Sequence, residues 1–93
     1  MAKEHILPDF TKRQLQAQPL PGKPLIEILG TDRVLVENHK GISAYSLSEV
    51  IINVRHGQIR ILGEQLTLSA MNREQVVVSG MMGSVELHRR TKP

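Results

Sequence analysis

The sequence predicts a single all-β domain, an antiparallel meander of seven to eight short strands forming a small sandwich or a partly open barrel. From Pro24 onward, apolar residues alternate with polar ones at a period of two, which is typical of strands with one buried face. Glycines and polar residues interrupt this pattern every few residues, as turns do. The length of 93 residues favours one domain.

The predicted core is aliphatic. The chain has no Trp and no Cys, one Phe and one Tyr, so neither disulfides nor clustered aromatic rings can supplement the core. Branched aliphatic side chains fall on one face of each segment and polar groups on the other. The inward residues are Ile26 and Ile28; Val34 and Val36; Val50, Ile52 and Val54; Ile59 and Ile61; Leu66 and Leu68; Val76 and Val78; and Val85 and Leu87.

Turn signals separate these segments. The expected turns are centred on Gly30, on residues 38–41, on Gly57, on Gly63 and on residues 70–74. Glycine suits such positions because it reaches positive φ at little cost. Residues 38–41 are expected to form a hairpin loop, and Gly63 is expected to separate two strands.

The strands occupy only part of the chain. We expect residues 1–23 to be an extended or weakly helical lead-in, residues 24–88 to be the β domain and residues 89–93 to be a basic tail. The first residues lack the apolar segment of a signal peptide, and no apolar stretch approaches the roughly 20 residues that span a bilayer. A soluble, cytoplasmic protein is therefore expected.

The net charge of +3 lies at the ends of the chain. Residues 1–24 hold four cations and two anions, and residues 88–93 hold three cations. Residues 25–87 hold five cations and seven anions, so the predicted folded part is mildly acidic. The overall basic charge therefore describes the ends and not the domain.

No group of residues in the sequence predicts catalysis, a metal site, a cofactor or a small-molecule substrate. The histidines lack the spacing of metal ligands and are interpreted as exposed loop residues: His5, His39, His56 and His88. The glycines lie between predicted strands and not at the start of a helix, which disfavours a phosphate-binding loop. No G-x-S-x-G nucleophile elbow is present. A non-enzymatic protein without a cofactor is expected.

Binding of nucleic acid or anionic lipid through the basic ends is the alternative function. The cations at the ends are Lys3, Lys12, Arg13 and Lys23, together with the C-terminal sequence HRRTKP. Proteins that bind single-stranded nucleic acid also use aromatic rings to stack bases, and aromatic residues make up 2% of this chain. Nucleic acid is therefore the less favoured partner.

Residues 25–87 resemble the YabP/YqfC family of sporulation proteins, and the YqfC branch most closely. The element ENHKG at residues 37–41 looks like a hairpin of that family, and the strand-and-glycine pattern that follows has a similar order and spacing. The positions that match the family motif at turns are Glu37, Asn38, His39, Gly41, Gly57, Gly63 and Gly80.

This resemblance implies a part in endospore formation and spore coat assembly in the mother cell, through protein–protein interaction. The family supplies no catalytic residues. Its members are often encoded beside a membrane-bound sporulation protein, so the expected partners are such a protein at the forespore membrane surface, a second copy of the chain, or both. We expect strands 25–29 and 85–87 to be the sheet edges to which a partner strand can add.

Overall fold

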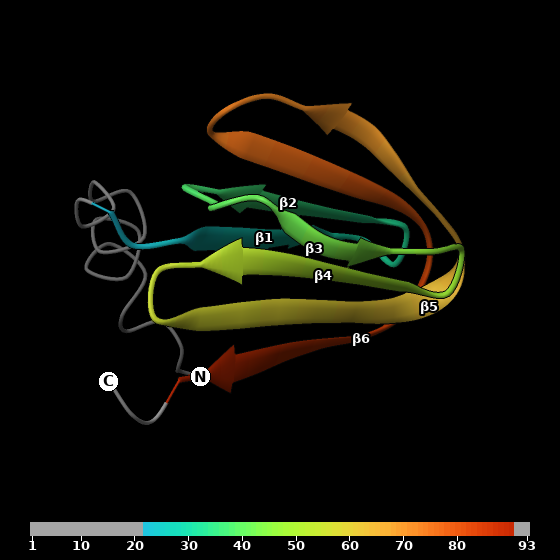
Figure 1. The fold of residues 1–93 in the computed structure, drawn as a ribbon. Helices are drawn as coiled ribbons and strands as arrows, with labels where there is room; N and C mark the ends of the chain where they lie inside the picture. The colour runs from blue at the N-terminus through green and yellow to red at the C-terminus, as the bar shows by residue number, and fades with distance from the viewer. Residues whose placement is uncertain (1–21, 91–93) are drawn as a thin grey trace, which may run out of the picture.

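The computed structural model describes residues 22–90, which form six antiparallel β-strands and no helix (Figure 1). The strands are β1 (Leu25–Leu29), β2 (Arg33–Glu37), β3 (Ile42–Tyr45), β4 (Glu49–Val54), β5 (Gly57–Met71) and β6 (Gln75–Arg89). The prediction of an all-β, antiparallel fold is confirmed. Within residues 22–90, no helix has the length and apolar character needed to cross a membrane. The lead-in predicted for residues 1–23 lies almost entirely outside the described residues.

The predicted number of strands is wrong because β5 and β6 each join two of the expected strands. β5 continues through Gly63 and β6 continues through Gly80, and each strand is 15 residues long. Neither segment contains proline, and three register shifts between the two strands absorb the extra residues as β-bulges. A glycine inside the alternating pattern marks a bulge here, not a turn.

The strand order β1-β2-β6-β5-β4-β3 also differs from a simple meander. All six strands belong to one open sheet, so the expected sandwich or barrel is wrong in detail. β1 is an edge strand, as predicted, but the other end of the order is β3. β6 lies between β2 and β5 because β2 pairs with residues 75–79. Residues 84–89 of β6 pair with β5 only, so this half of the strand does leave one side unpaired.

The open sheet curls because β5 and β6 bend near their centres (Figure 1). At the bend Gly80 has a φ of +139°, and a Cβ atom there would lie 2.7 Å from the carbonyl oxygen of Gln65. A Cβ atom on Gly63 would overlap the carbonyl oxygen of Met81. Only glycine allows the two backbones to approach this closely. The bend brings β3 and β4 in front of β1 and β2 in Figure 1.

The curled sheet encloses one aliphatic core. The fully buried side chains come from β2, β4, β5 and β6: Val34, Val36, Val50, Ile52, Ile59, Ile61, Leu66, Val76 and Val78. Each contributes about 1.5–3 kcal/mol of stability when it is buried. The period-two prediction of the core is confirmed for these residues. It is wrong for Ile28 and Leu87, which are 58% and 71% exposed.

Candidate functional site

Residues 37–41, the element that resembles the family hairpin, do not form a hairpin. They connect β2 to β3, which lie in different parts of the strand order and do not pair with each other. Asn38 makes the turn with a φ of +64°, a conformation that Asn tolerates better than most residues. Its backbone N–H donates to the carbonyl of Glu74 at 2.7 Å, and its side-chain amide donates to the carbonyl of Lys23, also at 2.7 Å.

His39 lies in the centre of this connection and is buried, with 7% of its surface exposed. The prediction of an exposed loop histidine is therefore wrong for this residue. The backbone N–H of Gly41 donates to His39 Nδ1 at 2.9 Å, which requires the proton of the neutral ring to be on Nε2. Nε2 lies 2.8 Å from the carbonyl oxygen of Asn72 and donates to it. Both ring nitrogens are satisfied within the protein.

The end of the connection is bonded to β4. The N–H of Lys40 donates to the carbonyl of Asn53 at 2.6 Å, and the N–H of Asn53 donates to the carbonyl of Gly41 at 2.8 Å. At the start of the connection, the side-chain amide of Gln75 donates to Glu37 at 2.8 Å. Residues 37–41 thus join β2, β4 and the β5–β6 turn through hydrogen bonds.

The three remaining predicted positions are spread over the fold. Gly57 was predicted to lie in the β4–β5 turn, but it is the first residue of β5, directly after that turn, and it faces Arg89 on β6. Gly63 and Gly80 lie together at the bend. The seven family-motif positions therefore divide between the connection, one turn and the bend, and the structure does not bring them into a single cluster.

A seam separates β1 from residues 84–89 of β6. Ile28 pairs with the buried Val34, and Leu87 pairs with the buried Ile59, so both side chains belong to the core face of the sheet. Both are nevertheless more than half exposed, because the sheet does not close over them. The seam is this gap, with an unpaired strand edge and an uncovered core-face side chain on each side.

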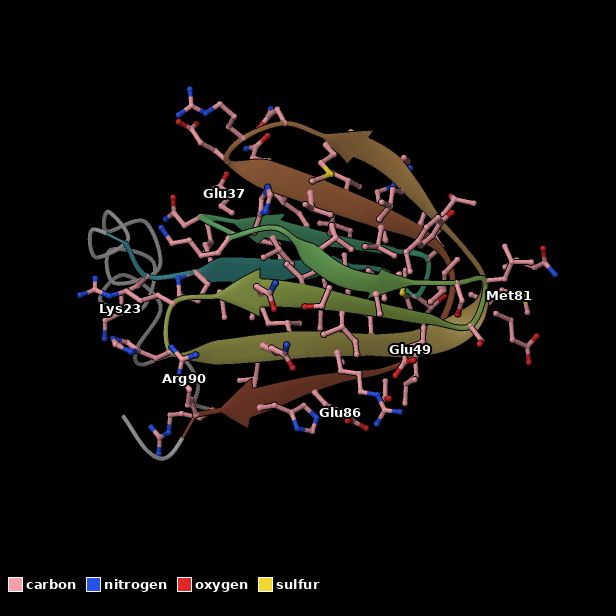
Figure 2. All side chains as sticks on the ribbon, in the orientation of Figure 1. Lys23, Glu37, Glu49, Met81, Glu86 and Arg90 are labelled. Atoms are coloured by element: carbon pink, nitrogen blue, oxygen red, sulfur yellow. The ribbon has the colours of Figure 1, made fainter. Side chains whose placement is uncertain are left out.

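One end of the seam opens into a recess of about 500 Å³, here called the basic mouth. Its polar lining consists of Lys23, Arg55, His56, Gln58, His88, Arg89 and Arg90, and its apolar lining includes Ile26, Val54, Ile59 and Leu87. A second groove continues from it past Lys40. Lys23 and Arg90 lie at the same end of the molecule in Figure 2, whereas Met81 lies at the opposite end.

The basic mouth concentrates the positive charge of the folded chain. Five of the eight Lys and Arg residues between positions 22 and 90 line the two grooves, and none of the seven Asp and Glu residues in this range does. Three cations and seven carboxylates remain on the rest of this part of the chain. The described protein therefore has a positive end and an otherwise acidic surface.

A polar cluster covers the outer face of β4, β5 and β6. Arg60 Nε lies 2.5 Å from Glu49 Oε2, and Arg60 Nη1 lies 3.6 Å from Glu86 Oε1. His88 Nε2 lies 2.8 Å from the same oxygen of Glu86. The hydrogen bond from His88 and the charge of Arg60 lower the pKa of Glu86, and the hydrogen bond to Glu49 raises the pKa of Arg60. The two carboxylates thus share one cation, Arg60.

The described residues contain no group of three or more His, Asp or Glu side chains that could hold a metal ion. His39 uses both ring nitrogens in hydrogen bonds, and His88 contacts one carboxylate. His56 lies in the β4–β5 turn with a φ of +68°. The histidines at positions 39, 56 and 88 thus have separate roles, and His5 lies outside the described residues.

The basic mouth and the seam were not predicted from the sequence. Arg89 and Arg90 fall in the predicted basic tail, but residue 89 is still in β6, and the N–H of Arg90 donates to the carbonyl of His56 at 2.8 Å. This bond places Arg90 beside the turn that carries Arg55. The clustering depends on the pairing of β5 with β6, which the sequence pattern alone does not specify.

Comparison with known proteins agrees with the resemblance inferred from the sequence. The chain is 29% identical over 62 residues to "Uncharacterized protein YqfC" of Bacillus subtilis (strain 168), a match that covers 67% of each chain. No solved structure matches it significantly. The profile described as the YabP family matches residues 22–93, which include all six strands, the seam and the basic mouth. The chain therefore belongs to the YabP family.

Proposed function

We propose that this chain takes part in endospore formation and spore coat assembly as a non-enzymatic protein that binds other proteins by strand addition at the seam. Membership of the YabP family supports the role in sporulation. The exposure of Ile28 and Leu87 supports the mode of binding, since both are core-face side chains on unpaired strand edges.

Strand addition follows from the chemistry of the two edges. An edge strand presents unpaired backbone N–H and C=O groups, and an extended segment of a partner can pair with them. A segment lying against β1 would also cover Ile28, and burying such a side chain contributes about 1.5–3 kcal/mol. Strand addition therefore satisfies the backbone and completes the core in one step.

β1 is a better edge for this purpose than β3. β1 is five residues long and pairs with β2 in an unbroken register. β3 is four residues long, and its register with β4 shifts between Ile42 and Ala44. Short, irregular edge strands are a common device that prevents pairing with other chains. The regular edge of β1 is thus the one that supports partner binding.

The proposed partners are a membrane-bound sporulation protein of the mother cell, a second copy of the chain, or both. A membrane-bound partner would hold this protein at the forespore membrane surface from the cytoplasmic side. The seam offers backbone edges and apolar side chains, which are suited to binding a polypeptide.

Replacing Ile28 with Lys tests the proposal. The charge would have to be buried under an added strand, so binding should be lost, whereas the exposed site should change the free energy of unfolding by no more than about 0.5 kcal/mol. The matched control is Leu47→Lys, because Leu47 is 57% exposed in the β3–β4 turn. Light scattering after size-exclusion chromatography would measure self-association of the wild type and both variants.

The same variants should be compared in a spore-forming host. Deletion of the gene is expected to impair spore formation or coat morphology, and the Leu47→Lys protein is expected to restore it while Ile28→Lys does not. Full restoration by a folded Ile28→Lys protein would contradict strand addition at β1. Normal spores after deletion would contradict the role in sporulation.

A further inference from the structure

We infer that the segment bound at the seam is acidic at the end that lies in the basic mouth. This inference rests on the proposed strand addition and adds the chemistry of the partner. The basic mouth is continuous with the seam, because Ile26 and Leu87 line it from the two facing strands. An extended segment lying along β1 would therefore pass the cations at this end of the molecule.

The fold itself gathers these cations. Antiparallel pairing places Arg89 opposite Gly57 and His88 opposite Gln58, beside the turn that contains Arg55. Lys23 approaches from the start of β1 on the other side of the seam. The side chains of Lys23, Arg89 and Arg90 are exposed, and no carboxylate of residues 22–90 lines the mouth. An excess of like charge attracts an oppositely charged partner.

Charge argues against an occupant from this chain. Residues 1–21 contain three cations and two anions, and residues 91–93 add a lysine. A second copy that presented the same end would place cations against cations, which is unfavourable. A partner with two or more Asp or Glu residues next to an alternating apolar segment matches both surfaces. Its carboxylates would neutralise the cations of the mouth, and its apolar side chains would cover the seam.

The composition of the mouth also favours a polypeptide over other anions. No Phe, Tyr or Trp lines it, so bases of a nucleic acid would lack the large aromatic rings on which they commonly stack. A membrane surface is broad, whereas these cations surround a recess between two strands. The unpaired edges of β1 and of residues 84–89 provide backbone donors and acceptors, which an extended peptide matches.

Selection of peptides from a random library displayed on phage would test this inference with the full chain as the target. Selected peptides should alternate apolar residues and carry Asp or Glu at one end. Selection on the Arg89→Gln, Arg90→Gln double variant should retain the apolar alternation and lose the acidic end. The matched control is Arg33→Gln, Arg73→Gln, which removes the same charge from exposed positions outside the mouth and should keep the acidic preference.

The contribution of the arginines to binding affinity is measured with a selected acidic peptide and with a version of it that has Gln in place of the acidic residues. The double variant at positions 89 and 90 should bind the acidic peptide about fivefold more weakly at low ionic strength, as expected for two exposed ion pairs. The wild type should lose a similar factor when salt is raised or when the peptide is neutralised.

The outcomes separate this inference from the proposed function. Alternating apolar peptides without an acidic end would overturn the inference and leave strand addition intact, with Ile28→Lys abolishing their selection. Failure to select any such peptide would contradict strand addition itself. Equal losses in the two arginine double variants, or tighter binding to a single-stranded oligonucleotide or to phosphatidylglycerol vesicles than to the acidic peptide, would also overturn the inference.

Discussion

His39 is the buried polar side chain of residues 22–90, and its replacement by Ala should be costly. The change leaves the Asn72 carbonyl and the Gly41 N–H without partners and opens a cavity, so we expect a loss of about 2–4 kcal/mol. Urea unfolding followed by circular dichroism would measure it. The control His56→Asn, in an exposed turn where Asn tolerates positive φ, should stay within about 0.5 kcal/mol; an equal loss in both variants would contradict this role for His39.

The sequence shows that position 39 lies between strands but not that its side chain is buried. The ENHKG element contains polar residues and a glycine, which is also the composition of a surface hairpin. The burial of His39 comes from the β5–β6 turn, where Asn72 lies 33 residues away along the chain. Contacts of this kind depend on the fold and leave no local signal.

At the scale of elements, the bend in β5 and β6 requires glycine at position 80. Replacing Gly80 with Ala places a Cβ atom against the carbonyl of Gln65 in a backbone conformation that L-residues rarely adopt, so we expect a loss of about 2 kcal/mol or more. Thermal unfolding would measure the loss. Gly83→Ala is the matched control, since its φ is not positive and its nearest neighbour is 3.1 Å away. Similar losses in the two variants would contradict a special role for Gly80.

Strand positions were largely predictable, and strand continuity was not. The alternation of Val34 with Val36 and of Ile59 with Ile61 predicts the core correctly, because a buried face requires that period. Gly63 and Gly80 were interpreted as turns because a glycine between two alternating segments fits a turn and a bulge equally well. The sequence also does not predict the pairing of β2 with residues 75–79 of β6, since Val-rich segments of similar length can pair in several orders.

At the scale of the whole molecule, the curl of the sheet determines where the positive charge of the chain gathers. The sequence places cations near both ends of the folded chain, and the curl brings Lys23 to the same end as Arg90 (Figure 2), where Arg89 also lines the mouth. The net charge of the sequence does not reveal this polarity, because none of the seven carboxylates between residues 22 and 90 lines the mouth. The seam ends at this positive region, so the sheet gap and the charge define one surface.

The shared core predicts that the two ends of the long β5–β6 hairpin unfold together. Ile59 and Ile61 lie between β4 and β6, while Val76 and Val78 lie between β2 and β5, and all four are buried in one cluster. Native-state hydrogen exchange in dilute protein should therefore show the slowest and nearly equal rates for their amides. Amides of β1, of β3 and of residues 84–89 of β6 should exchange fastest among the strands, because each of these segments pairs with one neighbour.

The His39→Ala variant provides the control for this cooperativity. Because residues 37–41 join β2 to β4, the substitution should accelerate exchange at Ile59 and at Val76 by the same factor. Acceleration confined to Val76 would mean that the part of the sheet containing β2 opens independently of the part containing β4. The connection would then be a local turn, and the bend would not transmit stability between the two parts of the sheet.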